Sequence, residues 1–153
     1  MIGRVARCAP ALVILAGFAA RAEDGGSPVG FWSTGPAPDN GVIEIFACDS
    51  GYCGKLVHLQ PRPPGTPTVD LKNPNAARRG DPLCGLVMMG SFKADGTGKF
   101  VGGWAYDPDS GNTYSGQMKL DGPDTLKLRG YVGIPLFGRT ETWTRETGDF
   151  SRC

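Results

Sequence analysis

After residue 22, apolar and polar residues alternate in eight short runs that are separated by turn residues. Most runs alternate imperfectly with a period of two, as strands with one solvated face do, and no window shows the 3.6-residue period of a helix. Gly (24) and Pro (13) are abundant, which breaks helices and marks turns. The pattern predicts an all-β domain whose strands lie at 29–34, 41–48, 53–60, 84–92, 98–106, 112–120, 125–133 and 138–145.

The turns between the later runs carry the sequences ADGTG, DPDSGN and DGPD, which favour hairpins because Gly, Asn and Asp tolerate positive φ. Eight antiparallel strands joined by tight hairpins can hide both sheet edges by closing into an up-and-down barrel. We therefore expect an eight-stranded antiparallel up-and-down β-barrel, with a flattened sandwich as the alternative. At eight strands the interior holds side chains or one small ligand.

One connection, residues 61–83 between the third and fourth strands, is long and contains six prolines. Connections of this length without secondary structure are uncommon in compact domains and often serve as lids or binding loops. A disordered excursion is the alternative. We expect a short helical turn within it, capped by Asn73 with Pro74 at the first helical position.

Residues 1–22 have the pattern of a cleaved signal peptide. Arg4 and Arg7 precede an apolar run at 8–20, and Ala20-Arg21-Ala22 matches an A-x-A cleavage site, so Glu23 is the expected mature N-terminus. The apolar run is shorter than the roughly 20 residues of a membrane-spanning helix. A retained anchor is the alternative. Residues 23–153 then form a single domain of a size that suits one core.

Cleavage would leave 13 basic and 15 acidic residues, a net charge of −2. No basic stripe is present, so the electrostatic footprint of a nucleic-acid-binding protein is missing. No sequence after residue 22 is apolar enough over a sufficient length to predict a transmembrane segment. We expect an exported protein that is periplasmic or secreted.

Four cysteines remain after the signal sequence, an even number that predicts two disulfides in an oxidising compartment. Three pairings are possible. We favour Cys48–Cys53 with Cys84–Cys153, because the first two flank the turn-like DSGY. Zinc is a weak alternative, since the chain has no C-x-x-C pair and His58 is its single histidine.

The stretch YDPDSGN at 106–112 could be read as a calcium loop, because Asp107, Asp109 and Asn112 offer oxygen ligands. No closing Glu follows until Glu141, and strand-like sequence flanks the stretch on both sides. Pro108 and the nearby Gly suit a hairpin turn. We interpret the stretch as a turn and expect neither a metal nor another cofactor.

Candidates for catalysis are few. No G-x-S-x-G motif is present, and His58 lies in the middle of a predicted strand, where a structural role is more common. Glu44 is an acid inside a strongly apolar strand; it points outward if the alternation holds, and needs a buried partner if it points inward. We lean against an enzyme, leaving a small hydrolase using Glu44 or Asp107 as an alternative.

The first and last strands carry Gly30-Phe31-Trp32 and Trp143-Thr144-Arg145. A Trp on the first strand covered by an Arg from the last resembles the barrel-closing arrangement of the lipocalin and calycin superfamily. The resemblance implies that Trp32 and Arg145 have a structural role in closing the barrel.

The whole mature chain also resembles DUF2147, a family of exported bacterial proteins of unknown function. The matching motifs include GFWST, VIEIFAC with CGKLVHL, DLKNPNAARR, PLCGLVMMGSF, GGWAYDPDSGNTYSG and LKLRGYVGIPLFGRTETWTR. The resemblance implies export and a lipocalin-like barrel, and no established activity. His58 stands where the family more usually has Trp, which weakens a catalytic role for it.

We expect a protein that binds a small apolar or amphipathic ligand inside the barrel. Tyr and Trp suit both core packing and cavity lining, and Arg139 could pair with a ligand carboxylate or phosphate. The alternative is a structural or envelope-interaction module with a filled barrel. The oligomeric state is left open, and the expected ligand-binding residues are Trp104, Tyr106, Tyr114, Tyr131 and Arg139.

Overall fold

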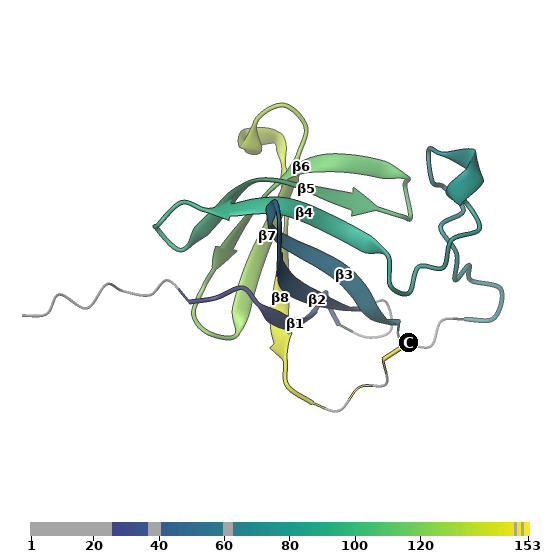
Figure 1. Cartoon of the computed structure of the whole chain (residues 1–153), viewed down its shortest axis with the longest axis horizontal. Helices are drawn as coiled ribbons and strands as arrows, with labels where there is room; N and C mark the ends of the chain where they lie inside the picture. The colour runs from purple at the N-terminus through teal and green to yellow at the C-terminus, as the bar shows by residue number, and fades with distance from the viewer. Residues whose placement is uncertain (1–25, 37–40, 60–62, 149, 151) are drawn as a thin grey trace, which may run out of the picture.

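The computed structural model describes residues 26–36, 41–59, 63–148, 150 and 152–153. The expected signal peptide, its cleavage site and Glu23 lie outside these residues. The described residues form eight strands and two short 3₁₀ helices, arranged as in Figure 1. They are β1 (Gly30–Ser33), β2 (Gly41–Cys48), β3 (Gly51–Leu59), η1 (Ala76–Arg78), β4 (Val87–Ala94), β5 (Lys99–Asp107), β6 (Asn112–Leu120), β7 (Thr125–Tyr131), η2 (Pro135–Phe137) and β8 (Arg139–Glu146).

The strands form a closed antiparallel barrel in sequence order, and β8 pairs back onto β1. This confirms the predicted fold and rules out the sandwich. The loops β1–β2, β3–β4, β5–β6 and β7–β8 lie at one end, which we call the open end. The hairpins β2–β3, β4–β5 and β6–β7 lie at the other end, which we call the closed end, together with the segment before β1.

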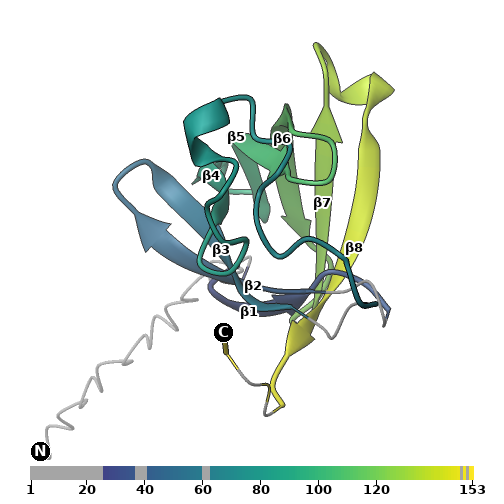
Figure 2. The same cartoon turned by 90° about the vertical axis from the view of Figure 1, so that its right-hand side faces the viewer.

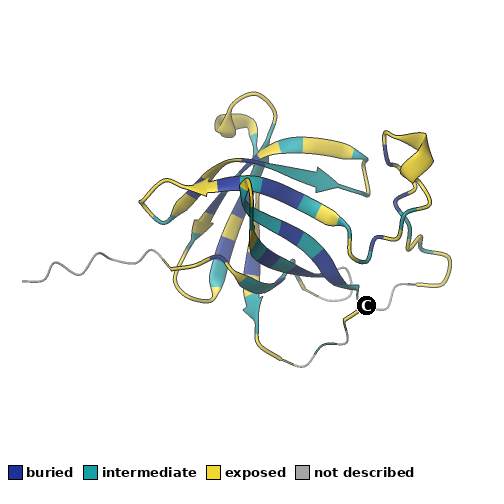
Figure 3. Cartoon of the chain, viewed as in Figure 1, coloured by how far each residue is buried: buried dark blue, intermediate teal, exposed yellow. Residues whose placement is uncertain are grey.

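Large side chains fill the half of the barrel near the closed end. On β2 and β7, buried apolar residues alternate with more exposed ones, and Figure 3 shows buried and more exposed positions along the strands. The buried residues of this half include Trp32, Ile45, Phe92, Phe100, Met118 and Leu126, each no more than 3 % exposed.

Phe92 is accommodated because its neighbours lack side chains. The ring lies against Gly103 on β5 and Gly116 on β6, and a Cβ at Gly116 would be 2.8 Å from the ring Cζ. A Cβ at Gly103 would come closer still. These two glycines therefore allow the Phe92 ring to pack directly against the backbone of β5 and β6.

The β3–β4 segment, residues 63–86 of the long connection, is ordered by its own hydrogen bonds. Asp70 N–H donates to the Asp81 carbonyl (2.9 Å) and Leu83 N–H to the Thr68 carbonyl (2.9 Å). Figure 2 shows the segment in front of strands β3 to β6. This arrangement contradicts the alternative of a disordered excursion for the described part of the connection.

The helical turn in this segment begins two residues later than expected. The cap of η1 is Asn75, whose side chain accepts a hydrogen bond from Ala77 N–H (3.1 Å). Asn73 cannot cap a helix because its side chain is used elsewhere: its carbonyl oxygen accepts from Asn75 N–H, and its amide donates to Asp70. The predicted cap at Asn73 with Pro74 at the first position was therefore wrong.

Both predicted disulfides are present. Cys48 and Cys53 are joined across the β2–β3 hairpin with a Cα–Cα distance of 5.9 Å. Cys84, at the end of the β3–β4 segment, is joined to Cys153 at 6.0 Å, which ties the C-terminal tail to the open half of the barrel. The tail is also held by the Cys153 N–H, which donates to the Val57 carbonyl on β3.

Candidate ligand-binding cavity

The closed end is sealed by contacts between the first strand, the last strand and the segment before β1. The Arg145 guanidinium lies 4.2 Å from the centroid of the Trp32 ring, and Trp32 is fully buried. Arg145 also donates to the carbonyls of Pro123 (2.7 Å), Val29 (3.0 Å) and Ser27 (3.2 Å). One side chain thus links three segments and covers the base of the barrel.

Above this filled base, the open half of the barrel contains a cavity of about 510 Å³. Its wall is largely apolar and comes from most of the strands and from the β3–β4 segment. Leu83 is the residue that the segment adds, and it is 3 % exposed. The apolar wall residues include Ile43, Leu56, Leu59, Leu83, Met88, Met89, Leu128 and Trp143.

Polar side chains gather where the cavity opens. The inward row of β8 runs from the mouth to the base as Arg139, Glu141, Trp143 and Arg145, because alternate residues of a strand share a face. Glu141 accepts a hydrogen bond from Trp143 Nε1 at 3.0 Å. Within the described residues, no hydrogen bond or ion pair engages the exposed side chain of Arg139. The guanidinium of Arg139 is therefore available at the mouth to donate hydrogen bonds to an anionic group of a ligand.

Four of the five residues expected to bind ligand border this cavity: Tyr106, Tyr114, Tyr131 and Arg139. Trp104 does not. It lies over Gly90, its partner on β4, and lines a shallow groove between the barrel wall and the β3–β4 segment. Tyr106 borders both this groove and the cavity mouth.

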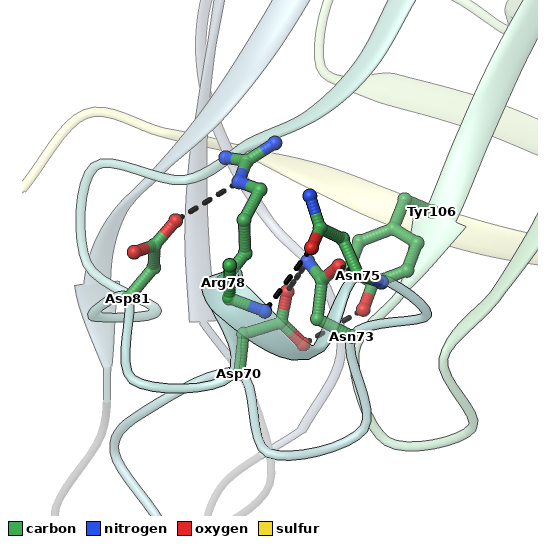
Figure 4. A network of polar contacts seen from close by, with 7 residues as sticks. Asp70, Asn73, Asn75, Arg78, Asp81 and Tyr106 are labelled. Carbon is green, nitrogen blue, oxygen red and sulfur yellow. Dashed lines mark hydrogen bonds and ion pairs between the residues drawn. The ribbon is translucent and has the colours of Figure 1, made fainter.

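Tyr106 connects the barrel to the β3–β4 segment. Its hydroxyl donates to Asp70 Oδ1 at 2.7 Å, and the other oxygen of that fully buried carboxylate accepts from the Asn73 amide at 2.7 Å (Figure 4). The pKa of Tyr106 is raised from 10.0 to about 12. Desolvation is the largest cause, and the hydrogen bond to Asp70 is the second. The pair holds the segment in place beside the cavity mouth.

The stretch with Asp107 and Asp109 forms the β5–β6 turn. Asp107 Oδ1 accepts from Asp109 N–H (2.9 Å), and its Oδ2 accepts from the Ser110 hydroxyl (2.7 Å). Gly111 adopts φ +75° and donates its N–H to the Asp107 carbonyl, which closes the turn. Both carboxylate oxygens of Asp107 are thus engaged in local structure, as the turn interpretation expects.

The other candidates for catalysis lie away from the cavity wall. Glu44 points outward from β2 and pairs with Lys55 Nζ at 3.2 Å on the neighbouring strand. The His58 ring lies edge-on to Phe150 of the C-terminal tail, with ring centroids 5.8 Å apart. These two side chains therefore contribute to the outer surface of the sheet.

Sequence reasoning missed several residues of the cavity. Glu141 could have been found, because it alternates with Arg139 and Trp143 along one strand. Leu83 and Phe137 could not, since they come from irregular segments without a period to read. Nor did any pattern connect Tyr106 with Asp70, which is 36 residues earlier in the chain.

A closed eight-stranded barrel, sealed at one end and hollow at the other, is a lipocalin-like fold. A solved structure, protein HP1028 from the human pathogen Helicobacter pylori, described as belonging to the lipocalin family, has a similar fold. It superimposes with a TM-score of 0.69 at 22% sequence identity, covering 79% of this chain and 84% of that one.

The family of this chain is shown by its sequence. Residues 30–145 match the model of DUF2147, described as an uncharacterized protein conserved in bacteria, and the chain belongs to this family. A search among curated proteins finds no match. Across the residues that the structure describes, no helix is long and apolar enough to cross a bilayer.

Proposed function

We propose that this protein is an exported binding protein that holds a small apolar or amphipathic ligand in the open half of its barrel. The observation that carries the proposal is the cavity of about 510 Å³, with an apolar wall and, at its mouth, Arg139, whose side chain has no partner among the described residues. Pockets for small molecules have about 300–1,000 Å³, mostly apolar walls and a few polar groups that fix orientation. A barrel packed solid with side chains would have no such space.

The charge and position of Arg139 suggest how a ligand would be oriented. A chain-like apolar body would lie against Leu56, Met89 and Trp143, where burial of apolar surface favours binding. An acidic group would remain at the mouth, where the guanidinium can bind a carboxylate or phosphate with two hydrogen bonds. Glu141, which is held by Trp143 Nε1, lies next along the strand and disfavours a ligand with two acidic groups.

Export is part of the proposal. Two disulfides and membership of a bacterial family are compatible with an oxidising compartment outside the cytoplasm. We propose that residues 1–22 are removed during export and that residues 23–153 act in the periplasm or outside the cell.

Native mass spectrometry on the protein purified without detergent from an oxidising compartment provides the first test. We expect an added mass that survives gentle ionisation and disappears on denaturation. If only the mass of the protein alone is found, both as purified and after incubation with a lipid extract of the envelope, the result contradicts ligand binding and favours a structural module.

The role of Arg139 is tested with dodecanoate and dodecanol, two probes with the same chain and different head groups. We expect Arg139→Gln to weaken dodecanoate binding about tenfold, in the range of a lost charge-assisted hydrogen bond, and to leave dodecanol unchanged. Trp143 reports binding through its fluorescence, since it lines the cavity. Trp104→Phe serves as the control because Trp104 lies outside the cavity. Equal loss for both probes contradicts an orienting role for Arg139.

A further inference from the structure

The loop between β7 and β8 exposes four large apolar side chains in a stretch of seven residues, 132–138. The exposed fractions are 72% for Val132, 52% for Ile134, 75% for Leu136 and 79% for Phe137. Single exposed apolar residues are ordinary, but a contiguous group marks an interaction surface. Figures 1 and 3 show this loop projecting beyond the strands, with its surface exposed.

The loop is held in one conformation, although its side chains lie in water. Arg129 on β7 donates from Nε to the Pro135 carbonyl (2.6 Å) and from Nη2 to the Leu136 carbonyl (3.2 Å), while its Nη1 donates to Thr140 Oγ1 (2.7 Å). The backbone of η2 adds a hydrogen bond from Gly138 N–H to the Pro135 carbonyl. These contacts fix the apolar tip before it meets a partner, which lowers the entropic cost of docking.

The loop is also continuous with the cavity. Val132 and Phe137 line the cavity mouth while remaining largely exposed, and Arg139 follows directly after the loop. An apolar surface thus runs from the cavity wall to the outside of the protein at its open end. A ligand with an apolar chain could follow this surface without crossing open water.

We propose that the 132–138 loop docks on the surface of a lipid bilayer, with Ile134, Leu136 and Phe137 inserted among the lipids and the cavity mouth facing the membrane. The docking itself rests on the loop; its use for loading or releasing a ligand rests on the proposed function. The basic side chain of Arg139 would lie at the level of the lipid head groups, where cations are favoured on anionic membranes.

The size of the loop favours a lipid surface over a second copy of the chain. A stable protein interface uses about 20–30 residues from each partner, whereas this patch has seven, on one projecting turn. A bilayer needs no complementary pocket, and a few inserted apolar side chains suffice for reversible binding. The size and the exposure of the loop therefore suit insertion into the surface of a bilayer.

The test is flotation with vesicles of phosphatidylethanolamine and phosphatidylglycerol, using the protein that begins at Glu23. The variant Ile134→Ser with Leu136→Ser removes two apolar side chains that do not line the cavity. We expect its partition coefficient to fall about tenfold or more, as two buried aliphatic groups are lost. The matched control, Val29→Ser with Val101→Ser, changes exposed apolar residues on β5 and before β1, and should bind like the wild type.

The proposal is overturned if the wild type does not float with the vesicles. It is also overturned if the partition coefficient falls equally in the loop variant and the control. A wild type that is dimeric in solution and becomes monomeric in the loop variant also overturns it, in favour of a second copy as the partner. Dodecanoate binding measured without vesicles should be equal in the loop variant and the wild type. If dodecanoate binds neither protein while flotation still depends on the loop, the proposed function fails and the docking stands.

Discussion

The Tyr106 hydroxyl donates to the buried carboxylate of Asp70 at 2.7 Å, and this contact joins β5 to a segment that lies 36 residues earlier in the chain. The other carboxylate oxygen is occupied by the Asn73 amide. The segment is closed on itself by its own backbone hydrogen bonds, and contacts such as this one fix where it lies against the barrel. The pair therefore sets the position of one side of the cavity mouth.

Replacing Tyr106 with Phe should release the β3–β4 segment. The substitution leaves one oxygen of a buried carboxylate unpaired, which costs about 1–3 kcal/mol. We expect faster hydrogen exchange at the amides of Asp70 and Leu83, whose hydrogen bonds close the segment on itself, with little change in the strands. Tyr131→Phe is the control, because the described contacts include none for its hydroxyl. If the rates of amide hydrogen exchange are unchanged in the Tyr106→Phe variant, Tyr106 does not hold the segment in place.

The raised pKa of Tyr106 predicts how stability depends on alkaline pH. The pKa is about 12 in the folded protein, against 10.0 for an unperturbed tyrosine. Because the folded value is the higher one, the contribution is complete below about pH 10 and is lost as the pH rises toward 12. The difference in unfolding free energy between wild type and Tyr106→Phe should shrink over this window.

A spectrophotometric titration of the phenols provides an independent check on that shift. We expect one tyrosine of the wild type to ionise near pH 12 and that step to be absent from Tyr106→Phe. If the wild type shows no step near pH 12, the Tyr106 hydroxyl is not held in this desolvated, hydrogen-bonded position in solution.

Two arginines on the same face of β8 can be compared, Arg145 at the closed end and Arg139 at the cavity mouth. Arg145→Lys should destabilise the protein by about 2–4 kcal/mol, because Lys cannot reach the carbonyls of Pro123, Val29 and Ser27 together while lying over Trp32. Arg139→Lys should change stability by less than about 0.5 kcal/mol, since Arg139 is exposed and unpaired among the described residues. Urea denaturation measures both. Equal effects contradict a special role for Arg145 at the base.

The sequence was sufficient to predict the barrel, because strand periodicity and hairpin chemistry are local signals. Tyr114 and Arg139, an aromatic and a polar residue within regular strands, border the cavity, and their contact with a ligand stays a prediction. Trp104 was misplaced because β5 contains a bulge: the register shifts between Phe100 and Gly103, and Gly102 has φ +73°. The inward positions become Gly103, Ala105 and Asp107, so Trp104 turns outward. Periodicity cannot reveal a bulge that shifts its phase.

The irregular segments set a second limit on prediction from sequence. Leu83 reaches the cavity, and Asp70 meets Tyr106, through the path of the β3–β4 segment, which depends on tertiary contacts with the barrel. Propensity placed the helical cap at Asn73, but tertiary contacts used that side chain for Asp70 and Asn75 N–H. A buried hydrogen-bond network thus overrides a local preference.

The two disulfides should contribute unequally to stability, since one closes a short loop and the other a long one. The separations are 5 residues for Cys48–Cys53 and 69 for Cys84–Cys153. Because a disulfide restricts the unfolded chain, the first bridge should contribute about 2 kcal/mol to the free energy of unfolding and the second about 4 kcal/mol. We expect the double substitution Cys84→Ser with Cys153→Ser to lower the free energy of unfolding by the larger amount.

The matched variant, Cys48→Ser with Cys53→Ser, removes a bridge within one hairpin whose strands stay paired through their own backbone ladder. Urea denaturation of both variants at the same pH gives the comparison. The long-range variant should also lose protection at Cys153 N–H, which donates to the Val57 carbonyl. A larger loss of stability in the hairpin variant would contradict the expectation from chain entropy and would mean that local contacts of the Cys48–Cys53 bridge dominate its contribution.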